Sequence, residues 1–260
     1  MTQLSGKHVV ITGANGAVGR ATAAQCLQQG AHVFLTDVTP VEADALASLY
    51  PSASAGQYHF HRADVTDAAA VRDAFAAAMA TFGPVDAAVL AAGIEGMPGA
   101  LEDIPGEQLD AVLDVNIKGS FYWLQHCLRH MKARRSGSIV ALASISASLG
   151  SALLAPYAIS KHAVLGMVRS AALEAAPHGV RINAVSPGPI DSDMMRRIDT
   201  GLRELQPARV SAAGNAAAGI PAQRYASADE VAAMILFLCS DASRYCNGAN
   251  YMVDGGFSVK

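Results

Sequence analysis

The chain has 260 residues, of which 52% are hydrophobic and only 16% are charged, and its formal net charge is −3. This composition favours a compact globule over a disordered chain. The weakly acidic balance gives no general attraction for nucleic acid or for anionic membranes. The four cysteines are widely spaced without a Cys-x-x-Cys pair, which argues against a zinc site and a disulfide framework. We therefore expect no metal, and reduced thiols in a cytoplasmic protein.

Two segments bear on membrane targeting. The N-terminal MTQLSGKHVVITG lacks a secretory apolar region with a cleavage site. Residues 138–160 carry no charge and are long enough to span a bilayer. However, serines, Gly150 and Pro156 interrupt this segment, so a buried strand followed by a loop explains it better than a transmembrane helix.

Short apolar and β-branched runs alternate along the chain with longer Ala-rich stretches at helical spacing. The predicted strands are His8–Thr12, His32–Thr36, Tyr58–Arg62, Val85–Ala91, Ser138–Ala143, Arg181–Val185 and Ala249–Val253. The predicted helices are Ala17–Gln29, Val41–Tyr50, Ala68–Phe82, Gln108–Arg134, Tyr157–Ala176 and Ala228–Ser240. Stop signals such as Gly30 and Pro177 follow several of these helices.

Several of the predicted strands are apolar throughout, as strands covered on both faces should be. The strand–helix alternation predicts an α/β fold, a doubly wound parallel sheet with helices on both faces. Ligands of such sheets bind beyond the carboxyl ends of the strands. No linker divides the chain, so we expect a single domain over residues 1–260. Residues 188–226 break the rhythm with Gly and Pro, and we interpret them as a substrate lid rather than a plain surface excursion.

A glycine-rich turn joins the first strand to the first helix. It contains Gly13, Gly16 and Gly19, which permit a tight turn and close approach of a pyrophosphate to a helix N-terminus. Asp37 ends the second strand, 18 residues after Gly19. Its carboxylate suits the ribose hydroxyls of adenosine and repels a 2′-phosphate, and no base stands at Ala14, Asn15 or Val38. The pattern therefore predicts NAD(H) rather than NADP(H).

Tyr157 and Lys161 are four residues apart, which places both on one face of a helix. A nearby ammonium favours tyrosinate and lowers the phenol pKa. A phenol tuned in this way can donate a proton to a ketone or accept one from an alcohol. On its own, the pair is also typical of an ordinary helix surface.

Further motifs occur in order along the chain. Ser144 lies thirteen residues before Tyr157, and Asn116 begins the sequence Asn-Ile-Lys-Gly-Ser-Phe in the long central helix. Additional matching segments are Asp64-Val65, Asn183–Ile190 and Val253–Gly256. With these motifs the chain resembles the short, single-domain branch of the short-chain dehydrogenase/reductase family over nearly its whole length. The resemblance implies a Rossmann-like fold and a nicotinamide-dependent oxidoreductase.

The resemblance also implies a role for each catalytic residue. Tyr157 is the general acid/base, Lys161 lowers its pKa and binds the nicotinamide ribose, and Ser144 polarises the substrate oxygen. Asn116 positions a water in the proton path, whereas Ser146 and Ser148 are alternative serines better explained as loop hydroxyls. The implied cofactor-binding residues are Gly13, Asn15, Gly16, Ala17, Val18, Gly19, Asp37, Asp64, Val65, Ala91, Gly93, Tyr157, Lys161, Pro187, Gly188, Ile190 and Ser192.

Three positions depart from the family pattern. Ala17 replaces the middle glycine of the phosphate turn, and we expect a slightly shifted loop that still binds the cofactor. The usual Asn-Asn-Ala-Gly reads Leu90-Ala91-Ala92-Gly93, which removes amide hydrogen bonds near the centre of the sheet. Ser192 replaces a threonine and keeps the hydroxyl, which suits the nicotinamide carboxamide.

The predicted function is NAD(H)-dependent interconversion of a secondary alcohol and its ketone. The alternatives are an NADPH-dependent 3-oxoacyl reductase and a non-catalytic NAD(H)-binding regulator. Arg134-Arg135 and Arg196-Arg197 are the candidate basic patches for an acyl-carrier partner, and we interpret both as solvated pairs.

The substrate pocket is predicted by fewer residues than the catalytic reaction. Met194 and Met195 either form an adaptable substrate pocket wall or pack on their own domain, and the pattern fits both. Cyclic or aromatic alcohols, diols, steroids and small acyl ketones are all compatible with this pattern. The resemblance implies a homotetramer and no nucleic-acid or membrane partner.

Overall fold

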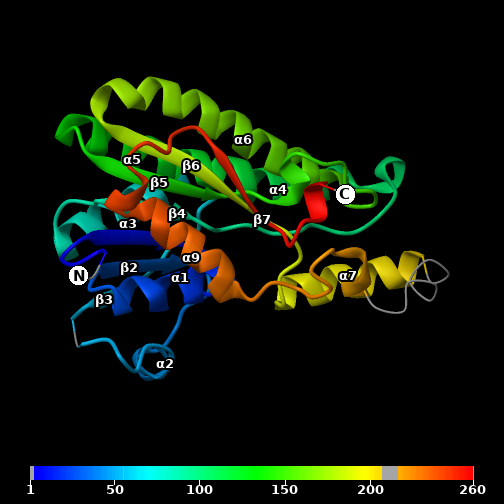
Figure 1. Ribbon diagram of the computed structural model, residues 1–260, viewed down its shortest axis with the longest axis horizontal. Helices are drawn as coiled ribbons and strands as arrows, with labels where there is room; N and C mark the ends of the chain where they lie inside the picture. The colour runs from blue at the N-terminus through cyan, green and yellow to red at the C-terminus, as the bar shows by residue number, and fades with distance from the viewer. Residues whose placement is uncertain (1–2, 55, 207–215, 260) are drawn as a thin grey trace.

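The computed structural model describes residues 3–54, 56–206 and 216–259, and its centre is a parallel sheet (Figure 1). The seven strands of this sheet follow the order β3-β2-β1-β4-β5-β6-β7. They are β1 (His8–Thr12), β2 (His32–Asp37), β3 (Tyr58–Arg62), β4 (Ala87–Leu90), β5 (Gly137–Leu142), β6 (Val180–Pro187) and β7 (Asn250–Val253). The order reverses direction between β1 and β4, where such sheets bind ligands. The predicted strands and fold class are confirmed.

Helices cover both faces of the sheet. They are α1 (Ala17–Gln28), α2 (Ala43–Leu49), α3 (Ala68–Phe82), α4 (Gly106–Leu113), α5 (Ser120–Arg134), α6 (Ala155–Ala175), α7 (Asp193–Leu205) and α9 (Ala228–Cys239). Alternate strand residues point to opposite faces, so Val10 packs with α3, α5 and α6, whereas Val9 packs with α1 and α9. Both layers are largely apolar, which is why the central strands β1, β4 and β5 read as mainly hydrophobic runs.

The predicted helix Gln108–Arg134 is interrupted. Between α4 and α5 the segment Asp114–Gly119 forms a π-helical turn, labelled η2. Two local contacts accompany this turn: Asn116 hydrogen-bonds the backbone of Ile94, and Gly119 lies so close to Val65 that a Cβ atom would be 2.6 Å from Val65 Cγ2. Helical periodicity alone does not predict such a turn, which is common at functional sites.

The segment predicted as a lid contains a defined helix, α7. Ser192 is its N-cap, and the Ser192 hydroxyl accepts the Met195 N–H at 3.2 Å. Ile198 is the only residue of α7 that is buried, so the helix lies on the surface of the domain. The remainder of the predicted lid between residues 207 and 215 lies outside the described residues.

The described residues also bear on membranes, metals and thiols. None of their helices is long and apolar enough to cross a membrane. None of their His, Cys, Asp and Glu side chains form a group of three or more suited to a metal ion. All four cysteines are free, and three of them are buried.

Candidate active site

A cavity of about 930 Å³ opens at the carboxyl ends of the central strands. The glycine-rich turn and Asp37 line it at one end, and Ser144, Tyr157 and helix α7 line it at the other. Lys161 and Asn116 stand behind its wall, at 4% and 1% exposure. The structure thus brings the predicted nucleotide residues and the predicted catalytic residues together in one site.

The glycine-rich turn is shaped by close backbone contacts. Gly13 has a φ of +63°, and a Cβ atom there would be 2.6 Å from the Ala92 nitrogen. A Cβ atom on Gly19 would collide with the Gly13 carbonyl oxygen. Helix α1 begins at Ala17 after Gly16, which provides no side-chain cap. The first N–H groups of α1 are therefore available to a pyrophosphate, and the Ala17 methyl is compatible with the turn.

Asp37 anchors the loops at the adenosine end of the cavity. Its Oδ2 accepts the Asn15 N–H at 3.0 Å, and its Oδ1 accepts the Thr39 N–H at 3.1 Å. A carboxylate has about four lone-pair positions, so it retains capacity for ribose hydroxyls. Arg20 also lines this end and donates to the Asn15 carbonyl at 2.7 Å. The sequence analysis overlooked Arg20 because it considered bases only at positions 14, 15 and 38.

The loops after β3 and β4 complete the cofactor side. Asp64, Val65, Ala91 and Gly93 all line the cavity. The Ala91 and Ala92 N–H groups both donate to the Thr12 hydroxyl, at 3.1 and 3.2 Å. This buried hydroxyl ties the β4 loop to β1, so the loss of the family's asparagine does not leave the loop untethered.

Gly93 marks the narrowest point of the cavity wall. A Cβ atom there would be 3.2 Å from Asn116 Oδ1 and 3.4 Å from Lys161 Nζ. The Asn116 amide donates to Ile94 O and to Ser160 Oγ, both at 2.9 Å, and its Oδ1 accepts the Ile94 N–H at 2.8 Å. Asn116 therefore joins the π-helical turn to the β4 loop and to α6.

Tyr157, Lys161 and Ser144 converge at the far end. Lys161 Nζ donates to Leu142 O at 2.8 Å and lies 5.5 Å from the centroid of the Tyr157 ring. Burial raises the pKa of Tyr157 to about 12, although a hydrogen bond with Ser144 lowers it. Burial likewise lowers the pKa of Lys161 to about 8. The pKa of Tyr157 thus lies above its ordinary value, opposite to the expected depression, because burial has the largest effect on it.

The Pro187–Ile190 turn connects β6 to helix α7. Gly188 packs so tightly that a Cβ atom would be 2.9 Å from Asp254 Cα. The Ser192 hydroxyl, which was expected to contact the cofactor carboxamide, lines the cavity while it caps α7 and donates to Ile190 O at 3.3 Å. Met194 and Met195 also line the cavity, as a substrate pocket wall requires.

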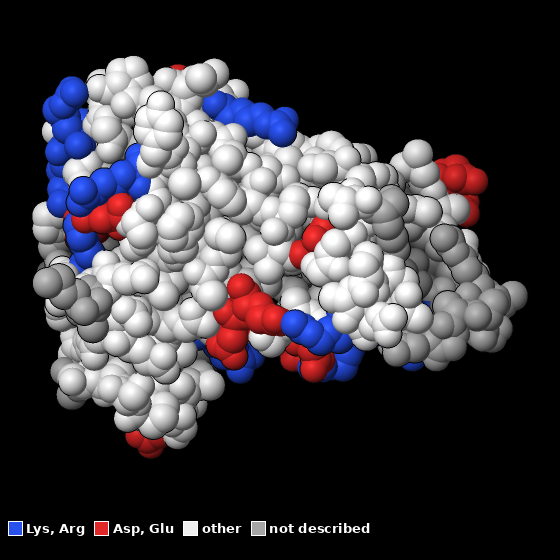
Figure 2. All heavy atoms as spheres, in the orientation of Figure 1, with Lys and Arg blue, Asp and Glu red and all other residues white. Residues whose placement is uncertain are grey.

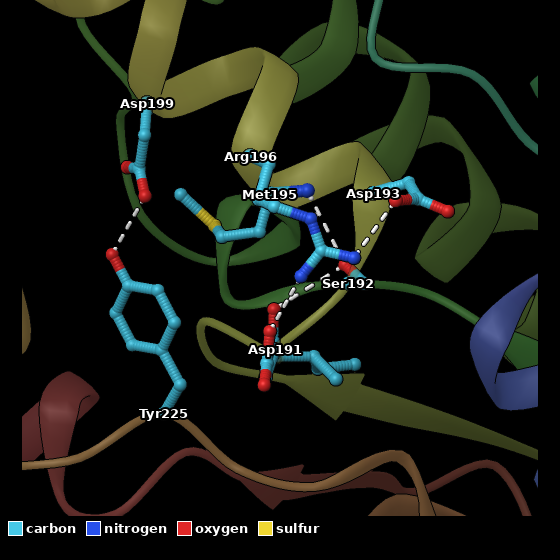
Figure 3. A network of polar contacts seen from close by, with 8 residues as sticks. Asp191, Ser192, Asp193, Met195, Arg196, Asp199 and Tyr225 are labelled. Atoms are coloured by element: carbon cyan, nitrogen blue, oxygen red, sulfur yellow. Dashed lines mark hydrogen bonds and ion pairs between the residues drawn. The ribbon is translucent and has the colours of Figure 1, made fainter.

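Ion pairs hold both arginines of the predicted solvated pair Arg196-Arg197. Arg196 bonds Asp191 and Asp193, each at 2.7 Å (Figure 3). Arg197 bonds Glu95, a residue that is 9% exposed and that the sequence analysis did not identify. Both arginine side chains are solvent-exposed, at 63% and 61%, as the interpretation of solvated residues expects. The Glu95 partner of Arg197 was not foreseen, because it lies 102 positions away in the sequence.

The doubly wound sheet and this site together define the class of a nicotinamide-dependent oxidoreductase. Over residues 13–258 the sequence matches a family model described as enoyl-(acyl carrier protein) reductase. Levodione reductase of Leifsonia aquatica is 33% identical over 99% of this chain and 96% of its own. The crystal structure of levodione reductase is similar with a TM-score of 0.90, over 98% of this chain and 99% of that chain.

Two further relatives show the same full-length similarity. L-rhamnose 1-dehydrogenase (NAD(P)(+)) of Azotobacter vinelandii is 36% identical over 97% of both chains. Cis-4-hydroxycyclohexanecarboxylate dehydrogenase of Sinomonas cyclohexanicum is 34% identical over 96% of both chains. The chain belongs to the short-chain dehydrogenase/reductase family.

Proposed function

We propose that this protein is an NAD(H)-dependent dehydrogenase that interconverts a secondary alcohol and its ketone. The observation that carries the proposal is the convergence of Ser144, Tyr157 and Lys161 at one end of a cavity whose other end holds Asp37 and the glycine-rich turn. The relatives support an alcohol–ketone reaction, since their names describe dehydrogenases and a reductase.

The chain's own residues supply the proton chemistry. When bound, the nicotinamide supplies or accepts the hydride. Tyr157 donates a proton to the ketone oxygen in reduction and takes it back in oxidation. Ser144, which hydrogen-bonds Tyr157, fixes the substrate oxygen beside the phenol. Lys161 places a positive charge near the ring, and Asn116 keeps the π-helical turn against the β4 loop.

Asp37 favours NAD(H) in this proposal. Its carboxylate faces the adenosine end of the cavity, where a 2′-phosphate would meet a negative charge. Arg20 is the opposing feature, because its guanidinium lines the same end and is a natural phosphate ligand. The relative named for both NAD(+) and NADP(+) shows that the family accommodates either choice.

The first experiment is titration of the purified protein with NADH and NADPH, followed by an absorbance screen of ketones and alcohols. We expect tighter NADH binding and turnover of a secondary alcohol. Asp37→Ala should weaken NADH binding and narrow the gap to NADPH. An unchanged ratio in that variant would contradict the role of Asp37, and a wild-type preference for NADPH would favour the 3-oxoacyl reductase.

Tyr157→Phe tests the catalytic assignment. Loss of the hydroxyl removes the proton donor, so turnover should fall by roughly 100-fold or more while NADH binding is retained. Tyr122→Phe is the matched control, since Tyr122 packs on the core and does not line the cavity. Tight cofactor binding without turnover in wild type would instead indicate a regulator that senses NAD(H).

We also propose a homotetramer, as expected from the resemblance. Exposed apolar residues on α5 and α6 support it, with Phe121 at 45%, Ile159 at 48% and Leu173 at 79% exposure. Much of the face in Figure 2 carries no charged side chain, as an associating surface would. A monomer in sedimentation at micromolar concentration would contradict this proposal.

A further inference from the structure

Glu95 is a buried carboxylate beside the catalytic centre. Its side chain is only 10% exposed, and its negative charge is close enough to Tyr157 to raise the phenol pKa, after the larger effects of burial and Ser144. A buried carboxylate is costly unless a cation or several hydrogen bonds compensate it. The cation that compensates Glu95 therefore matters for the substrate pocket, because it also lines that pocket.

That partner comes from the lid. Arg197 on α7 binds Glu95 at two points, with Nε 2.5 Å from Oε1 and Nη2 3.3 Å from Oε2. Such two-point contacts fix orientation as well as charge. The Arg197 side chain remains 61% exposed and lines the cavity, so the neutralising cation of Glu95 is also part of the cavity wall.

Other contacts keep α7 in the same place. Gly201 lies so close to the β4 loop that a Cβ atom would be 2.9 Å from Pro98 Cγ. Asp199, on the same helix, accepts a hydrogen bond from the Tyr225 hydroxyl at 2.9 Å (Figure 3). Helix α7 therefore packs on the β4 loop, and the Glu95–Arg197 pair links it to the carboxylate whose charge raises the pKa of Tyr157.

We propose that Glu95 is a specificity-determining positioning residue, which acts through Arg197 to restrict the site to uncharged alcohols and ketones. An anionic substrate would compete for the Arg197 guanidinium and leave Glu95 buried without its partner. A neutral substrate leaves the Glu95–Arg197 ion pair intact and otherwise contacts a largely apolar cavity wall. That wall includes Leu149, Leu154, Met194, Met195 and Leu202. The inference deepens the proposed function and rests on it for the identity of the reaction.

The test compares two ligands that differ in charge. Cyclohexanol and cyclohexanecarboxylate are titrated into the protein–NADH complex, with NADH fluorescence as the readout. Wild type should bind the alcohol more tightly. Glu95→Gln keeps the shape but frees Arg197, so the alcohol-to-anion preference should shift toward the anion by roughly tenfold or more, the gain from one charge-assisted hydrogen bond.

Two further variants separate charge selection from simple support of the fold. Arg197→Met alone should weaken the binding of both ligands, because it leaves the Glu95 charge uncompensated. Adding Glu95→Gln to this variant should restore binding of the alcohol. Arg203→Met is the control, since Arg203 is an exposed arginine on the same helix that does not line the cavity. Its ligand preference should equal that of wild type.

Several results would overturn the inference. These are equal weakening of both ligands by Glu95→Gln, a wild-type preference for the anion, or additive losses in the double variant. The readout does not require turnover. If the charge preference shifts as expected but no alcohol or ketone reacts, then the proposed reaction fails and the assignment of Glu95 stands.

Discussion

Lys161→Met should produce a protein that is more stable and inactive. Burial lowers the pKa of Lys161 from 10.5 to about 8. At about 1.4 kcal/mol per pKa unit, keeping this ammonium charged in the folded protein costs roughly 3 kcal/mol near pH 7. The methionine loses the charge-assisted hydrogen bond to Leu142 O, which is worth about 2 kcal/mol. The expected net gain is about 1 kcal/mol, or roughly 2–4 °C in Tm for a chain of this size.

The gain should depend on pH in a defined direction. Below pH 8 the lysine is protonated in both the folded and the unfolded protein, so the full cost is present in wild type. Between about pH 8 and 10.5 the folded protein binds fewer protons than the unfolded chain, so wild-type stability gains from this group as pH rises. The advantage of the methionine variant should therefore shrink over that interval.

The assay is urea unfolding at pH 7 and pH 9.5, with protein concentration held constant. Lys118→Met serves as the control, because Lys118 is 59% exposed and pairs with Asp114 at the surface. That change should move the free energy of unfolding by less than about 1 kcal/mol. A Lys161→Met protein that is less stable than wild type at pH 7 would refute the reasoning from desolvation.

Two further substitutions have matched controls nearby. Thr12→Val removes the acceptor of two loop N–H groups and should lower the free energy of unfolding by about 2 kcal/mol in urea titrations. Thr36→Val, at its register partner on β2, should be neutral or stabilising, since that buried hydroxyl has no partner among the described residues; equal losses would contradict this prediction. Gly19→Ala forces a methyl against the Gly13 carbonyl and should weaken NADH binding by roughly 10–100-fold in fluorescence titrations. Gly16→Ala meets only the Gly13 oxygen at 3.3 Å and should bind NADH almost normally; a ranking opposite to this would show that the turn is adaptable.

The sequence predicted features whose cause is local. Strand β3 matched its predicted bounds Tyr58–Arg62, and α3 matched Ala68–Phe82, where Asp67 caps the helix and Gly83 ends it. Helix caps, stop signals and hydrophobic patterns of period 2 or 3.6 each depend on residues close together in the sequence, so they predict the bounds of helices and strands. The Tyr157–Lys161 pair belongs to the same category, because one helical turn is enough to bring its members together.

The features that were missed depend on residues far apart in the sequence. The Glu95–Arg197 pair joins the β4 loop to helix α7, and neither residue belongs to a motif. The π-helical turn at Asn116 follows from its bonds to Ile94 and Ser160, which helical periodicity does not reveal. The phenol pKa was predicted with the wrong sign, because a charge at spacing four is visible in the sequence whereas the depth of burial is not.

Burial also affects the charge states of the two central residues of the proposed mechanism. Desolvation favours neutral Tyr157 and neutral Lys161, so each of their charged forms is unfavourable when it stands alone. A tyrosinate beside a lysine ammonium compensates both charges at once, and the 5.5 Å between Nζ and the ring centroid allows that compensation. Glu95 opposes it, since a second anion near the phenol disfavours tyrosinate and raises the pKa of Tyr157 even with Arg197 beside it. Loss of the Arg197 cation would leave the Glu95 charge uncompensated and should therefore make tyrosinate still less favourable.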